Sequence, residues 1–277
     1  MNKVVKDMLN AIWYLVVFLL IQAFAMFIVG TIWYVSQGKD LQTAVQTVGN
    51  GTTDGLVVVL WTIVSSLLTI LIFALCRWSP FSRSYLRTHP WLSLLWVVLL
   101  ACGTIIPSEW LLEQLNIQMP EGTEKMFEDI MGRPEGYIVI GILAPIAEEM
   151  VFRGAILRSL LKAFSSQMHW LAIILSALLF GVAHLNLPQG CHAFVIGLLL
   201  GWLYYRTNSI VPCVVFHWVN NTVAYVMFNL LPQAGDGKLI DLFHGNHRMM
   251  MYAIGFSLCI LLPALFQLAL RLRRPKE

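Results

Sequence analysis

The sequence has few charged residues and lacks the usual signatures of nucleotide or nucleic-acid binding. Charged side chains make up 12% of the 277 residues, against 58% hydrophobic ones. There is no Gly-rich phosphate loop and no basic stripe, so neither a nucleotide nor a nucleic acid is an expected partner. The five cysteines are scattered and form no CxxC pair, and we expect small buried apolar residues rather than a disulfide framework.

Long apolar runs take the place of charge, and the mean hydropathy is +0.73. Several runs exceed the ~18 residues that a membrane-spanning helix needs. The first follows two lysines like a signal peptide, but it continues about ten residues past the small-residue site, which favours a retained span. We therefore predict an all-α polytopic bundle of about eight transmembrane helices, at residues 11–35, 56–76, 91–107, 136–164, 170–187, 191–205, 210–231 and 249–270.

The distribution of Lys and Arg predicts the orientation of these spans. Basic residues gather in the two ends of the chain and in alternate loops, which places both termini in the cytoplasm. The outside segments include 108–135, with seven acidic residues against Lys125 and Arg133, which we interpret as amphipathic helices on the membrane surface. We divide the chain into an N-terminal part at 1–135, a four-helix core at 136–231, and a last span with a basic tail at 232–277.

Two adjacent carboxylates lie in the middle of the fourth predicted span. Charges at bilayer depth are rare and mark functional sites. Glu149 and Arg153 are i and i+4 on a helix, so their side chains can pair and neutralise each other. Glu148 points about 100° away from that pair and has no local base, which leaves it free to act as a general base or acid. Pro145, one turn earlier, predicts a kink or a local opening beside the carboxylates.

Histidine and asparagine add to this set on two later spans. His184 lies on the fifth predicted span, and His217 and Asn221 share one face of the seventh. Together with Glu148 they can support hydrolysis, in which a carboxylate activates water, imidazoles carry protons, and polar donors stabilise an oxyanion. We interpret the remaining histidines as interfacial or solvated residues, namely His89, His169, His192, His244 and His247.

A metal is the rival use of the same residues. Glu148, His184 and His217 could hold a divalent ion such as zinc with an open water position. Against this, the chain has no HExxH motif. From the residues alone, metal-dependent and metal-free hydrolysis both stay open.

Three motifs in order resemble one known family. Glu-Glu-x-x-x-Arg at 148–153, Phe-x-x-x-His at 180–184 and His-x-x-x-Asn at 217–221 are similar to the CPBP family, the Abi group of intramembrane proteases that includes the type II CAAX prenyl endopeptidases. The resemblance covers about 136–231. It implies that Glu148 activates water with support from Glu149 and Arg153, that His184 assists the water, and that His217 and Asn221 form an oxyanion site.

The resemblance implies an intramembrane endopeptidase in a bacterial cytoplasmic membrane, with a membrane-associated peptide or protein as substrate and the lipid bilayer as surroundings. It leaves the substrate open, prenylated or not, along with the oligomeric state. Bacterial relatives are also associated with bacteriocin self-immunity.

Two alternatives from other classes remain: a proton-coupled transporter with Glu148, His184 and His217 as a relay, and a non-catalytic immunity or scaffold protein. The transporter predicts inverted repeats, and none is evident in the sequence.

Overall fold

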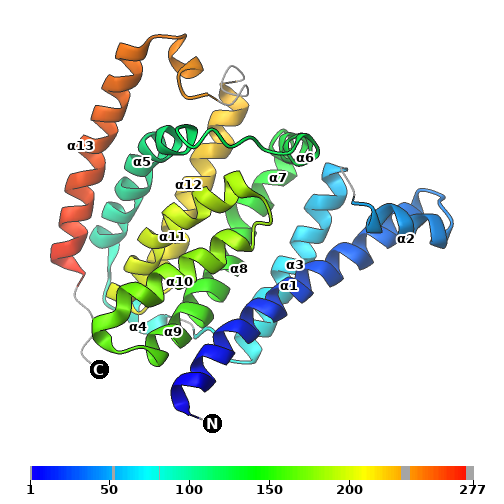
Figure 1. Cartoon of the computed structure of the whole chain (residues 1–277), viewed down its shortest axis with the longest axis horizontal. Helices are drawn as coiled ribbons and strands as arrows, with labels where there is room; N and C mark the ends of the chain where they lie inside the picture. Colours follow the sequence, from blue (N-terminus) through cyan, green and yellow to red (C-terminus); the bar gives the residue numbers. More distant parts are fainter. Residues whose placement is uncertain (1, 52–53, 81, 232–237, 273–277) are drawn as a thin grey trace.

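The computed structural model describes residues 2–51, 54–80, 82–231 and 238–272. Every regular element in these ranges is a helix, which confirms the all-α prediction (Figure 1). Six helices are long and apolar enough to cross a membrane, so the chain is a multi-pass membrane protein. They are α1 (Lys3–Ser36), α3 (Gly55–Leu75), α5 (Trp91–Glu113), α11 (Leu187–Thr207), α12 (Val211–Leu230) and α13 (His247–Arg271).

The fourth predicted span is a continuous helical path that alternates between two helix types. It consists of α7 (Pro134–Tyr137), η1 (Ile138–Leu143), α8 (Ala144–Glu149), η2 (Met150–Leu157) and α9 (Arg158–Ala163), and η1 and η2 are π-helical. The fifth is the short α10 (His169–Val182), which follows a 3-10 turn, η3 (Ser166–Met168). Because these two segments are interrupted or short, the count of eight spans stays a prediction.

The third predicted span ends later than we expected. We placed its end at Pro107, yet α5 continues through this proline to Glu113. A proline inside a helix removes one hydrogen bond, which packing with neighbours can outweigh. Here α5 packs against α12 and α13, and a Cβ on Gly103 would lie only 2.7 Å from the backbone nitrogen of Leu261 in α13. Residues 108–113, the beginning of the predicted surface segment, therefore form the last part of a membrane-spanning helix.

The turn before α11 also differs from the prediction. We expected it at 188–190, but Pro188 lies in the first turn of α11, where its missing N–H costs nothing. The chain instead reverses just before this proline, where Leu185 adopts a φ of +57°. Asn186 then caps α11 by accepting a hydrogen bond from the backbone N–H of Gln189 at 3.0 Å. An Asx cap and a proline at the first helical turn thus mark a helix start, which we interpreted as a helix end.

The loops hold further short helices. The first predicted loop contains α2 (Leu41–Gly49), capped by Asp40, and the basic loop contains α4 (Arg83–Leu86). The acidic segment contains the amphipathic α6 (Glu121–Met131), as predicted. The loop before α13 contains η5 (Asp241–Phe243). Residues 232–237 of that loop and the basic tail at 273–277 lie outside the described residues.

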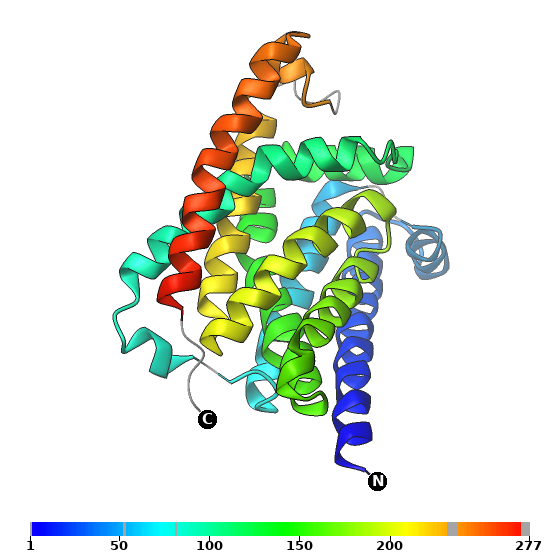
Figure 2. The same cartoon turned by 60° about the vertical axis from the view of Figure 1, so that its left-hand side comes forward.

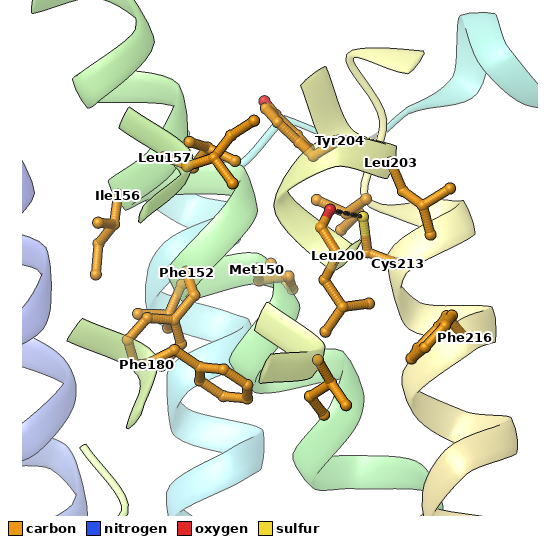
Figure 3. Packing of buried hydrophobic residues seen from close by; sticks show 14 of the residues in the cluster. Met150, Phe152, Ile156, Leu157, Phe180, Leu200, Leu203, Tyr204, Cys213 and Phe216 are labelled. Atoms are coloured by element: carbon orange, nitrogen blue, oxygen red, sulfur yellow. Dashed lines mark hydrogen bonds between the residues drawn. The ribbon is translucent and has the colours of Figure 1, made fainter. Parts of the chain in front are cut away.

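The core of the bundle is built around η2, which buries all eight of its residues. Figure 3 shows Phe152 of η2 beside Phe180 of α10, and Phe216 of α12 near Leu200 of α11. Gly197 and Gly201 of α11 face Ala177 and Ile173 of α10, so the small-xxx-small spacing does bring two helices together.

The five cysteines are free thiols in different surroundings. Cys213 is buried and donates to the carbonyl of Leu200 at 3.3 Å (Figure 3). Cys76 and Cys259 are exposed, so our expectation of burial was wrong for these two. The outer face of a membrane helix meets lipid, and a small apolar side chain is acceptable there.

The beginning of α1, the short α4 and the end of α13 lie toward the same end of the bundle (Figures 1 and 2). The acidic α6 lies toward the opposite end. This arrangement agrees with the orientation that Lys and Arg predict.

We predict that reporters fused after Lys276 and within the 116–120 segment will report opposite sides of the membrane. The positive-inside pattern places the first in the cytoplasm. Paired alkaline phosphatase and green fluorescent protein fusions measure this directly. If both positions report the same side, the predicted orientation is wrong.

Candidate active site

A buried ion pair lies at the junction of α8 and η2. The Nη1 of Arg153 donates to the Oε1 of Glu149 at 2.9 Å, and both side chains are 0% exposed. The guanidinium carbon also lies 4.4 Å from the ring centroid of Phe180, and Nη2 donates to the carbonyl of Gly197 at 3.4 Å. A Cβ on Gly197 would approach this nitrogen to 3.3 Å. The i,i+4 pair that the sequence predicts is therefore present and enclosed by α10 and α11.

His217 of α12 joins the pair from a third direction. Its Nδ1 lies 2.9 Å from the Oε1 of Glu149. A carboxylate only accepts hydrogen bonds, so Nδ1 carries the proton. The other nitrogen, Nε2, lies 3.8 Å from the Oε2 of Glu148. Glu149 thus fixes the tautomer and the orientation of His217, and it directs Nε2 toward the second carboxylate.

The two carboxylates differ in accessibility. The side chain of Glu148 is 22% exposed, whereas that of Glu149 is fully enclosed. Two atoms of the enclosed pair, the Oε2 of Glu149 and the Nε of Arg153, have no hydrogen-bond partner. Unpaired buried polar atoms destabilise a fold. The ion pair is therefore better explained by the geometry that it imposes than by the stability that it adds.

His184 lies outside the helix on which we placed it. Helix α10 ends at Val182, and His184 follows in the turn toward α11. Its Nδ1 bonds to the carbonyl of Phe180 at 2.9 Å, which leaves Nε2 free. The ring of Phe180 contacts both imidazoles edge-on, with centroids 5.0 Å from His184 and 5.9 Å from His217. Among the described residues no contact joins His184 to Glu148 directly.

The side chain of Asn221 supplies a hydrogen-bond donor to a backbone carbonyl of the fourth span. The N–H of Ala144 bonds to Val139, five residues back, which is the π-helical pattern. In this register the carbonyl of Ile140 faces Pro145, which has no N–H to give. The side-chain amide of Asn221 donates to that carbonyl at 2.9 Å. His217 and Asn221 therefore have different hydrogen-bond partners, and a shared role at one oxyanion stays a prediction.

Comparisons with known proteins find similarity in the segment that carries these residues. Residues 135–223 match the family described as type II CAAX prenyl endopeptidase Rce1-like. This match supports the resemblance of the segment to the CPBP family. A Bacillus subtilis (strain 168) protein named "Putative membrane peptidase YdiL" is 29% identical over 107 residues, which are 39% of this chain and 43% of that protein. The chain thus matches less than half of the length of this relative. No solved structure gives a significant match.

Beside the CPBP motifs lies a polar cluster that the sequence did not reveal. The Nδ1 of His192 lies 3.5 Å from the Oε1 of Glu109, and its Nε2 lies 3.5 Å from the amide of Asn220. Asn220 also donates to the Oδ1 of Asn221 at 3.4 Å. We interpreted His192 as interfacial or solvated because it lies at the end of a predicted span. The cluster could have been located only by recognising that α5 continues past Pro107, because this continuation carries Glu109.

A metal centre in the CPBP core has support in the donor chemistry but not in the spacing. Both His184 and His217 hold Nδ1 in a hydrogen bond and leave Nε2 free, as metal-binding histidines do. In the described part of the chain, however, no three His, Cys, Asp or Glu side chains converge closely enough to hold a metal ion. As arranged, Glu148, His184 and His217 do not fit a metal centre.

We predict that Glu149→Gln and Arg153→Gln each reduce the thermal stability of the purified protein strongly, by about 3–5 kcal/mol. Either change leaves one buried charge without its partner. The double variant should be more stable than the less stable of the two single variants. Lys125→Gln is the matched control, because its i,i+4 pair with Glu121 is 68% and 81% exposed and should contribute little. If the double variant is no more stable than the less stable of Glu149→Gln and Arg153→Gln, the two charges are not coupled as described.

Proposed function

We propose that the protein is an intramembrane endopeptidase that hydrolyses a peptide bond of a membrane-associated substrate with water activated by Glu148. One observation carries this proposal: the accessible Glu148 faces the Nε2 of His217, whose other nitrogen is fixed by the enclosed Glu149. The membrane helices and the family match support the same class of activity.

The first element of the mechanism is a preset imidazole. Glu149 accepts from His217 and from Arg153 with one oxygen, so it orients the ring while the guanidinium neutralises its charge. The buried carboxylate of a Ser-His-Asp triad has the same role toward its histidine. The neutral imidazole then offers the lone pair of Nε2 toward Glu148.

The second element is the water. The 3.8 Å between the Oε2 of Glu148 and the Nε2 of His217 is too long for a direct hydrogen bond. One water molecule beside this gap can bond to both atoms. As the water oxygen attacks the substrate carbonyl, one water proton passes to Glu148 and a C–O bond forms. Glu148 then gives this proton to the nitrogen of the leaving amine as the C–N bond breaks.

The third element is stabilisation of the oxyanion. The resemblance assigned this role to His217 with Asn221, but the geometry favours a place for His217 beside the water. Asn221 uses one amide N–H on Ile140 and keeps a second. We assign this second N–H to the oxyanion, and we keep His184 as an assistant to the water through its free Nε2.

We predict that Glu148→Gln lowers turnover by at least about 10²-fold without loss of stability, because Gln cannot take a proton. The assay uses purified protein and a membrane-anchored peptide, with and without a chelator. Glu124→Gln, on the exposed face of α6, is the control and should keep full turnover. Retained cleavage by Glu148→Gln would contradict the mechanism. Loss of wild-type cleavage on chelation, with recovery on adding zinc, would require a metal-bound water instead.

A second experiment separates the two roles of Asn221. We predict that Asn221→Leu lowers turnover by roughly 10²-fold because the oxyanion loses a donor. It should also destabilise the protein because the carbonyl of Ile140 loses the donor that Asn221 supplies. Pro145→Ala supplies a backbone N–H, so in this background Asn221→Leu should regain stability but not turnover. Recovery of both would make the role of Asn221 purely structural.

A further inference from the structure

A basic pocket lies at the end of the bundle that holds the beginning of α1 and the end of α13. Its volume is about 420 Å³, and it is lined by the turn after α4, the first turn of α5, and the last turns of α11 and α13. The side chains that matter below are His89, Leu92, Ser93, Arg206 and Arg271. Among the described residues no carboxylate lines it. We call this cavity the basic pocket.

The two guanidinium groups of the pocket are held in place without being neutralised. Arg206 donates through Nε to the carbonyl of Leu272 at 2.5 Å and through Nη2 to that of Ala269 at 2.7 Å. The Nε of Arg271 donates to the side chain of Gln267 at 3.3 Å. Among the described residues neither arginine forms an ion pair. Two positive charges therefore face one cavity with neutral partners only, which favours an anionic ligand.

The apolar rim of the pocket indicates what kind of anion fits. Leu92 lines the cavity and is 50% exposed, and its neighbours Trp91 and Leu95 on α5 are 62% and 53% exposed. These side chains begin the lipid-facing surface of a membrane-spanning helix, and a tryptophan at a helix end is typical of the headgroup level. A ligand in the basic pocket therefore has its charge among arginines and a hydrocarbon surface directly beside it.

We infer that the basic pocket binds the phosphate-bearing headgroup of an anionic phospholipid, with the acyl chains along Leu92 and Leu95 of α5. Arg206 and Arg271 supply the charge, and Ser93 and His89 line the same cavity as further polar partners. The predicted orientation places this end in the cytoplasmic leaflet, and basic pockets between helices on that side bind anionic headgroups. The proposal does not depend on the peptidase activity.

Thermal unfolding of the purified protein in mixed micelles tests the inference. Phosphatidylglycerol should raise the melting temperature with saturation, because a ligand that binds only the folded state stabilises it. Phosphatidylcholine should not. Arg271→Gln should weaken the apparent affinity for phosphatidylglycerol roughly fivefold. Arg83→Gln is the matched control, since Arg83 lies on α4 near the same end but does not line the pocket, and it should respond like the wild type.

Further arms make each outcome decisive. Ser93→Met puts a longer side chain into the pocket while leaving both arginines, and it should weaken the response to phosphatidylglycerol even if Arg271→Gln unfolds. An equal response to phosphatidylcholine, or a full response by Ser93→Met, would overturn the inference. Inorganic phosphate is the soluble probe. If it protects the protein as well as the lipid does and competes with it, the pocket takes a free phosphate and the lipid assignment is wrong.

Discussion

The site depends on neutralising one charge in the interior of a membrane protein. Arg153 is the largest fully buried side chain of the described residues, and it is acceptable there only because Glu149, Gly197 and Phe180 surround it. These partners come from α8, α11 and α10, and His217 adds α12 through the same carboxylate. A single requirement, that no charge be left alone in low dielectric, thus joins four segments that are distant in sequence.

The second constraint is the irregular backbone beside the carboxylates. A π-helical register next to a proline leaves a carbonyl without a donor, and in a membrane no bulk water can supply one. The chain solves this with a side chain from α12. The irregular segments η1 and η2 flank the short α8 that carries both glutamates, and π-helical turns are frequent at functional sites. The break in the helix and its repair by Asn221 are therefore parts of one arrangement.

The sequence predicted those features that depend on local geometry. The pairing of Glu149 with Arg153 follows from an i,i+4 spacing within one helix, and the spans follow from the length of apolar runs. His217 forms its hydrogen bond with Glu149 and not with Glu148 because of how α12 packs, and residue spacing in the sequence does not reveal this packing. Similarly, α5 continues through Pro107 because neighbouring helices hold it, and the Glu109–His192 contact became visible only with that continuation.

The difference between the two glutamates follows from their order relative to the arginine. Glu149 is four residues before Arg153, so helix geometry commits it to the pair, and full enclosure keeps it there. Glu148 is turned about 100° away, keeps some exposure, and lies near the Nε2 of His217. A carboxylate that must stay charged to neutralise a buried guanidinium cannot also take up a proton during turnover. In the proposed mechanism two adjacent acids divide these incompatible tasks: Glu149 holds its charge fixed, and Glu148 is free to change its own.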